Sequence, residues 1–187
     1  MENVLKHYDE KYPKPELVIG IAGPAGTDLT ELSNSLAGLI KPYGYNCFQI
    51  RVSQLIASVC DDAVRQKIDA AKFGGKVQYL MNAADHIRRD VDSGAATLPL
   101  ILSRHLRQEF LLKEGCSIDF EDIELYNRCY IINSLKHPDE VKLLRKIYGS
   151  KFIMISAFSE YQSRVKNLVK QIQKSYQTTD KKAFHAE

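Results

Sequence analysis

Short apolar runs alternate with longer amphipathic stretches along this chain. Runs rich in Val, Ile, Tyr and Phe predict buried strands of a parallel sheet at 17–22, 47–52, 128–132 and 152–156. Apolar residues that recur every three or four positions predict helices after the first, third and last of these strands. A strand, a helix and a parallel strand in succession indicate an α/β fold that gathers its loops at the carboxyl ends of the strands.

A helical pattern over 61–112 interrupts this alternation and predicts a helical insertion. Gly74 and Gly75 precede one of its helices as a hinge or cap, and a second apolar face follows over 98–110. The first apolar face consists of Val77, Leu80, Met81, Ala84, Ile87 and Val91. Its polar flanks, which are candidates to meet an anionic ligand or a partner subunit, are Arg88, Arg89, Arg104, His105 and Arg107.

The last helix has apolar residues on one side and lysines on the other. The spacing predicts that the apolar side faces inward and that Lys166, Lys170 and Lys174 face outward. The residues predicted to point inward are Tyr161, Val165, Leu168, Val169 and Ile172.

The first strand leads through a glycine-containing loop into a helix. Asp28 and Glu31 form a capping box, so the helix should begin at Thr27 or Asp28. Gly23 and Gly26 permit positive φ angles and a close approach of backbone N–H groups to a ligand. Because unpaired N–H groups at a helix N-terminus favour anions, the stretch predicts a phosphate-binding loop. Its candidate residues are Gly23, Pro24, Ala25, Gly26, Thr27, Asp28 and Thr30.

The loop departs from the Walker pattern G-x-x-x-x-G-K-[ST] at two positions. Gly23 and Thr30 match its ends, but Asp28 replaces the second glycine and Leu29 replaces the phosphate-gripping lysine. An ionised Asp28 would repel a triphosphate unless it turns away to cap the helix. We therefore expect binding without efficient phosphoryl transfer, and a tight turn without a ligand is the alternative.

Cationic side chains at other strand ends could replace the missing lysine. Arg51 lies at the end of the second strand and Lys136 and His137 follow the third, at the sheet edge where open parallel sheets bind ligands. Arg164 lies one turn into the last helix, where nucleoside monophosphate kinases often place lid arginines. These residues join the predicted nucleotide-binding set, and Lys136 is the best substitute.

Composition indicates a soluble globular protein, with 44% hydrophobic and 26% charged residues and a net charge of +3. We expect a single domain over 1–187, with an N-terminal arm over 1–14 and a polar tail or linker over 175–187. Without a membrane-length apolar run or a signal-peptide core, the cytoplasm is the expected location. The charge suits anionic small molecules but does not argue for nucleic acid. Without a Cys-x-x-Cys pair, the cysteines are expected to be reduced and buried: Cys47, Cys60, Cys116 and Cys129.

Four stretches together resemble the N-terminal, kinase-like P-loop domain of the anti-phage dCTP deaminases. They are 16–29, 126–149, 152–156 and 159–169, and the segment Ser134-Leu-Lys-His-Pro138 with its helix is the most specific. The resemblance implies a P-loop fold like that of nucleoside monophosphate kinases. It also implies a domain that precedes a zinc-dependent deaminase, which destroys dCTP during phage infection, and a regulatory RNA as a partner.

The chain itself lacks the sequence signature of that deaminase. A zinc cytidine deaminase needs His-x-Glu and Pro-Cys-x-x-Cys. No Pro-Cys-x-x-Cys occurs here, and His185-Ala-Glu187 matches the first half by letters alone. We therefore expect the deaminase domain to be absent from this chain. The chain should have no resident cofactor: magnesium would enter with the nucleotide, and zinc belongs to the missing domain.

These patterns lead to a first interpretation as a nucleotide-binding regulatory domain of an antiviral dCTP deaminase. Its ligand would be a dNTP, a dNMP or ATP, it would form a homo-oligomer, and no membrane would be involved. An active nucleoside monophosphate kinase, using Lys136 or Arg164 in place of the lost lysine, is the second interpretation. The third is a P-loop fold kept only as a protein or RNA interaction module. No residue is assigned a catalytic role.

Overall fold

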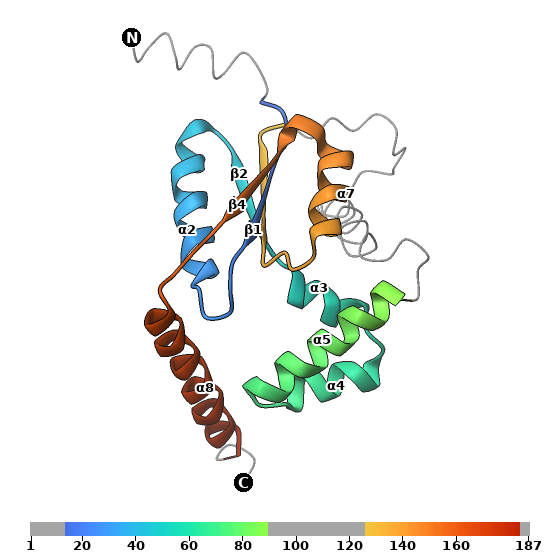
Figure 1. Ribbon diagram of the computed structural model, residues 1–187, viewed down its shortest axis with the longest axis vertical. Helices are drawn as coiled ribbons and strands as arrows, with labels where there is room; N and C mark the ends of the chain where they lie inside the picture. The colour runs from blue at the N-terminus through green and yellow to red at the C-terminus, as the bar shows by residue number, and fades with distance from the viewer. Residues whose placement is uncertain (1–13, 90–125, 184–187) are drawn as a thin grey trace.

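The computed structural model describes residues 14–89 and 126–183 (Figure 1). Several sequence predictions concern residues outside these two ranges, or side chains within them that the structure does not describe. They concern the arm over 1–13, the second apolar face of the insertion, Arg88, Val91, Arg104, His105, Arg107 and Cys116.

The described strands form one parallel sheet in the order β2-β3-β1-β4. The strands are β1 (Leu17–Ala22), β2 (Asn46–Arg51), β3 (Arg128–Asn133) and β4 (Phe152–Ser156). The predicted α/β fold with a parallel sheet is therefore confirmed. The first and last strands have the predicted bounds, whereas β2 begins and ends one residue earlier than predicted.

Helices flank the sheet, and an insertion lies beyond its carboxyl edge (Figure 1). They are α2 (Leu29–Ile40), α3 (Val52–Val59), α4 (Asp62–Ala70), α5 (Phe73–Arg89), α7 (Pro138–Tyr148) and α8 (Tyr161–Ala183), with short 3-10 turns η1 (Lys41–Tyr43) and η3 (Gly149–Lys151). Among the described residues, none of these helices combines the length and apolar character required to cross a bilayer.

The central strand β1 is buried on both faces, as its continuous apolar run predicts. Ile19 and Ile21 pack with Leu29 of α2 on one face. Val18 belongs to the cluster on the other face, together with Leu144 of α7. The two helices therefore hold opposite faces of the same strand and fix the position of the loop that follows it.

The insertion differs from its prediction in two respects. Helix α5 begins at Phe73, so Gly74 and Gly75 lie in its first turn and do not precede it. Only part of the predicted apolar face is covered, because Val77 and Met81 are 41% and 57% exposed. The insertion lies at the end of the sheet (Figure 1), and within the described part of the chain these two side chains of α5 stay exposed.

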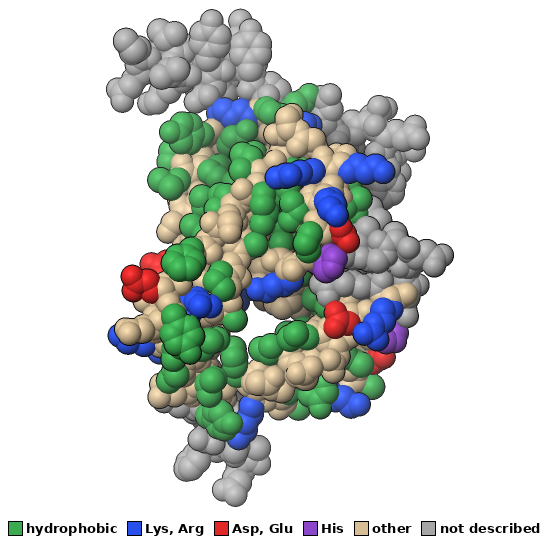
Figure 2. Space-filling view, viewed as in Figure 1, with side chains coloured by type: hydrophobic (Ala, Val, Ile, Leu, Met, Phe, Trp, Pro, Cys, Tyr) green, Lys and Arg blue, Asp and Glu red, His purple; other side chains and the backbone are tan. Residues whose placement is uncertain are grey.

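The prediction that the last helix packs inward is wrong. Tyr161, Val165, Val169 and Ile172 are all exposed, and Leu168 is only partly buried. Helix α8 leaves the end of β4 and extends away from the sheet, where Figure 2 shows hydrophobic side chains on its surface. It continues to Ala183 through the segment predicted as a polar tail.

Cys47 on β2 and Cys129 on β3 lie opposite each other on adjacent strands of the sheet. Both are free thiols, as is Cys60, in agreement with the reduced state predicted from the sequence. The prediction that the cysteines are buried is correct for Cys129, which is completely buried, and wrong for Cys47 and Cys60, which are only partly buried. Burial, together with the neighbouring Cys47, raises the pKa of the Cys129 thiol from 9.0 to about 12.

We expect Cys129 to react with iodoacetamide far more slowly than Cys60 in the folded protein. A rise of about three pKa units lowers the thiolate fraction of Cys129 about 1,000-fold near neutral pH relative to a thiol with the ordinary pKa, and burial also restricts access of the reagent. Burial raises the pKa of the Cys60 thiol as well, but this thiol is partly accessible. Mass spectrometry of cysteine-containing peptides after timed alkylation measures both rates, with the unfolded chain as control. Equal rates for the two thiols in the folded protein would contradict the expectation.

The raised pKa of Cys129 also determines how the stability of the fold changes with pH. The folded state holds the Cys129 proton more tightly than the unfolded chain does, so this group stabilises the fold fully below about pH 9. Its contribution is lost as the pH rises through the interval to about 12. The melting temperature should therefore fall over this alkaline range.

Candidate functional site

The candidate phosphate loop connects β1 to α2 and ends at a side-chain cap. Asp28 is the N-cap residue, and its Oδ1 accepts a hydrogen bond from the Glu31 N–H at 3.0 Å. The helix thus begins at Leu29, one residue after the later of the two predicted starts. The prediction that Asp28 caps the helix is confirmed, and its carboxylate satisfies one of the N–H groups at the helix N-terminus.

A turn reverses the chain within the loop. The Thr27 N–H donates to the Pro24 carbonyl at 3.1 Å, and Gly26 between them has a φ of 86°. A positive φ at this place in a turn favours glycine. The prediction for Gly23 requires correction, because positive φ is found among the described glycines only at Gly26, Gly44 and Gly149.

Gly23 is instead required by close packing. A Cβ atom at this position would lie 3.0 Å from both the Ala157 carbonyl oxygen and Leu29 Cδ2. The Ala157 N–H in turn donates to the Ala22 carbonyl at 2.8 Å. The loop therefore begins in contact with the segment that follows β4.

Helix α8 contacts the middle of the loop. Asn167 Nδ2 donates to the Gly26 carbonyl at 3.0 Å, and a Cβ atom on Gly26 would collide with the Arg164 carbonyl. Thr27 Oγ1 and Arg164 Nε are buried atoms without a hydrogen-bond partner in the described part of the chain. Asn167 is not among the predicted site residues, and nothing in its local sequence distinguishes it from a solvated polar residue.

Two of the predicted cations lie at the loop. Lys136 Nζ donates to the Gly23 carbonyl at 3.3 Å, and Arg51 Nη2 donates to Thr30 Oγ1 at 3.3 Å. Both come from the carboxyl ends of neighbouring strands, as the parallel topology predicted. Lys136 thus approaches the loop from β3, although the residue at the Walker lysine position is Leu29.

The backbone around Lys136 is held by two acceptors. The Ile21 carbonyl accepts hydrogen bonds from Ser134 and Leu135, each at 3.0 Å, while Ser134 adopts a φ of 78°. Glu140, only 1% exposed, accepts from the Lys136 N–H at 2.9 Å. These contacts fix the direction in which the chain leaves β3.

Glu140 also accepts the N–H of His137 at 3.1 Å, and His137 is the N-cap of α7. His137 Nδ1 in turn accepts from the Asp139 N–H at 3.2 Å. The structure thus gives His137 a capping function, and its predicted contact with a nucleotide stays a prediction. Glu140 is not among the predicted site residues, although its position three residues after an N-cap was a usable signal.

Arg164 approaches the loop through its backbone. Its guanidinium carbon lies 5.7 Å from the centre of the Tyr161 ring, an arrangement within the range of cation–π contacts. The structure therefore places the residue beside Gly26, but its side chain packs partly along α8. Its predicted role as a lid arginine stays a prediction.

The loop offers unused backbone donors beside these cations. Within the described part of the chain, the N–H groups of Gly26, Asp28 and Thr30 donate no hydrogen bond. Lys136 and Arg51 add positive charge, whereas the capped Asp28 adds negative charge. The arrangement suits an anion held by both backbone and side chains. No cluster of three or more His, Cys, Asp or Glu that could hold a metal occurs within the described ranges.

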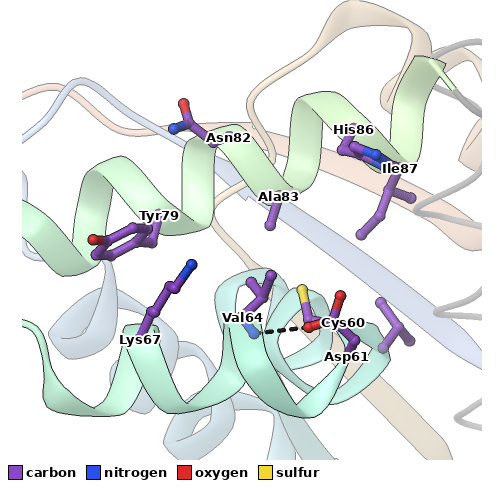
Figure 3. Close-up of a pocket in the computed structure, with 10 residues that line it drawn as sticks. Cys60, Asp61, Val64, Lys67, Tyr79, Asn82, Ala83, His86 and Ile87 are labelled. Carbon is purple, nitrogen blue, oxygen red and sulfur yellow. Dashed lines mark hydrogen bonds between the residues drawn. The ribbon is translucent and has the colours of Figure 1, made fainter.

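A separate cleft of about 450 Å³ lies between α4 and α5 (Figure 3). Lys67 and Tyr79 lie toward one end and Asp61 toward the other, where its Oδ1 caps α4 by accepting the Val64 N–H at 2.7 Å. None of the loop residues lines this cleft. This cleft could not be predicted from the sequence, because it depends on the packing of two helices with ordinary amphipathic patterns.

Comparison with known proteins adds no family assignment. A scan against protein-family models finds no match, and a search of curated proteins finds no significant match.

We expect Gly26→Ala to destabilise the protein and Gly38→Ala to stabilise it. Alanine at position 26 would keep an unfavourable positive φ and collide with α8, at a cost of about 1 kcal/mol or more. Gly38 lies in α2 with open space around it, so alanine there should add about 0.5–1 kcal/mol. Thermal unfolding followed by circular dichroism compares the two. A Gly26→Ala protein that melts at or above the wild-type temperature would contradict the packing described for the loop.

Proposed function

We propose that this chain binds a nucleotide through the Gly23–Thr30 loop and acts without efficient phosphoryl transfer. The observation that carries the proposal is the contact between Lys136 Nζ and the Gly23 carbonyl. This contact brings an ammonium group to a loop that lacks the Walker lysine. The unused backbone N–H groups of the loop are the complementary donors for phosphate oxygens.

The burial of Leu29 supports the absence of efficient transfer. This residue is 8% exposed and packs with Ile19 and Ile21 in the cluster between α2 and the sheet. The position that supplies the phosphate-gripping cation in the Walker pattern therefore belongs to the hydrophobic core. Because phosphoryl transfer depends on positioning and charge neutralisation, a lysine from a different strand is expected to support binding better than catalysis.

The proposed biological role rests on the resemblance described above. We propose a regulatory domain of an antiviral dCTP deaminase that senses a dNTP, a dNMP or ATP and assembles as a homo-oligomer. The deaminase chemistry would belong to a zinc domain outside these residues, and a regulatory RNA is the further partner implied by the resemblance. Tyr126 to Gly149, which includes Lys136 and its supporting Glu140, is the segment shared by the resemblance and the candidate site.

Magnesium would accompany a bound nucleotide. Thr30 stands where the Walker pattern places a metal-binding hydroxyl, and its Oγ1 accepts a hydrogen bond from Arg51. A metal at this hydroxyl would have to replace that contact. Magnesium in nucleotide sites takes few protein ligands and completes its shell with phosphate oxygens and water, so one hydroxyl suits such a site.

The same lysine favours a second candidate function, an active nucleoside monophosphate kinase. Lys136 would then neutralise the transferred phosphoryl group in place of the missing cation. A coupled assay for ADP formation with dCMP or dTMP as the acceptor separates the two functions. Sustained turnover would favour the kinase, and binding without turnover would favour the sensor.

We expect Lys136→Ala to weaken nucleotide binding about tenfold or more, because a charge-assisted hydrogen bond to phosphate would be lost. Lys142→Ala is the matched control, since Lys142 lies on α7 and pairs with Asp139 at 2.8 Å. Isothermal titration with a panel of nucleotides, with and without magnesium, measures both effects. Absence of binding to every nucleotide in the panel would refute the proposed function.

A further inference from the structure

An opening lies below the carboxyl edge of the sheet, between α8 and the α4–α5 pair. Figure 2 shows hydrophobic side chains on both sides of it. The two sides approach each other at one end, where Lys72 Nζ lies 4.2 Å from the centre of the Tyr176 ring. The opening is therefore bounded by α8 on one side and by the insertion on the other.

The side formed by α8 carries the apolar stripe that was predicted to be buried but is exposed. Val165, Val169 and Ile172 are 39%, 45% and 41% exposed, and Tyr176 continues the same helical spacing. Since the Tyr176 ring contacts Lys72 just before α5, this stripe faces the insertion. The lysines Lys166, Lys170 and Lys174 fall on other faces of the helix.

Helix α5 carries a smaller exposed apolar pair on the side that its helical spacing turns away from α4. Val77 and Met81 are one turn apart and exposed, while Ala84 on the same helix is buried in the core. This pair differs from the residues of α5 that line the cleft toward α4, which include Tyr79 and His86 (Figure 3). The opening and that cleft therefore use different faces of α5.

The candidate phosphate loop adjoins the top of the α8 side. Gly26 packs against the Arg164 backbone, and Val169 lies five positions further along the helix, about 7.5 Å along its axis. Lys136 and Arg51 add positive charge at the same edge of the sheet. An anion-binding edge therefore continues into a space with apolar sides.

We propose that the base of a mononucleotide lies between the apolar stripes of α5 and α8 while its phosphate occupies the Gly23–Thr30 loop. This inference rests on the proposed function and adds the position of the base. In this arrangement one face of the flat base contacts Met81 of α5 and the other face contacts Val169 of α8. We call this space between the two apolar stripes the base slot. Because its side chains carry no strong hydrogen-bonding groups, it should bind a nucleotide more tightly than a sugar phosphate without a base, and it should discriminate weakly among the bases.

The test compares nucleotides with a ligand that has the same head group but no base. Isothermal titration uses dCMP, dTMP and dAMP against deoxyribose 5-phosphate. We expect each nucleotide to bind about tenfold tighter than the sugar phosphate, since base stacking and burial are added. If none of these ligands binds while a nucleoside triphosphate does, the position assigned to the base fails and the proposed function stands; if no nucleotide binds at all, the proposed function fails. If the sugar phosphate binds as tightly as the nucleotides, the base slot fails while the phosphate loop stands.

Charged substitutions on the two sides give the second comparison. Met81→Asp and Val169→Asp should each weaken dCMP binding about tenfold more than deoxyribose 5-phosphate binding, because the added charge repels both phosphates but only the base loses contacts. Leu39→Asp is the matched control: Leu39 is 67% exposed on α2, outside both stripes. Equal losses for both ligands, or no loss for either, would overturn the slot.

A tryptophan reporter keeps the test decisive if the aspartate variants unfold. The chain has no tryptophan, so Met81→Trp places a single indole at the proposed slot. A base stacked beside it should change the fluorescence on addition of dCMP, whereas deoxyribose 5-phosphate should not. An identical response to the two ligands would overturn the position assigned to the base.

Discussion

The carbonyl oxygen of Ile21 is the acceptor on which the arrangement of the site depends. It lies near the end of the central strand and receives the N–H groups of both Ser134 and Leu135. These two hydrogen bonds direct the chain from the end of β3 across the end of β1. Glu140 then accepts hydrogen bonds from the N–H groups of Lys136 and His137. The position of Lys136 relative to the loop follows from this crossing. A polar contact within the backbone thus decides where a charged side chain can act.

Local signals explain why much of the fold could be predicted. Pro138 lies at the start of α7 and Gly149 directly follows its last residue, which are the positions that these two residue types favour at helix ends. The apolar runs of β1 and β4 are equally well bounded. The proximity of Lys136 to the loop was predictable for a more general reason, because parallel strands bring their carboxyl ends to one edge. Register and topology therefore carried more information about the site than the glycine pattern alone.

The incorrect predictions concern contacts between distant parts of the chain. Periodicity identified the apolar side of α8 but could not show that the helix departs from the sheet after β4. It likewise could not show that Asn167 reaches the Gly26 carbonyl across a large separation in sequence. Both outcomes depend on the direction in which a short connection leaves the sheet. Residue spacing identifies an amphipathic face, and only tertiary packing identifies what that face meets.

The burial of Leu29 makes a substitution at this one position costly. A change to lysine would introduce the residue of the Walker pattern, but it would also remove an apolar side chain from between α2 and the sheet and bring a charge close to that core. The lysine would have to extend its side chain out of the core to keep its charge hydrated. This position therefore couples the composition of the loop to the stability of the fold, so that one cannot be changed here without the other.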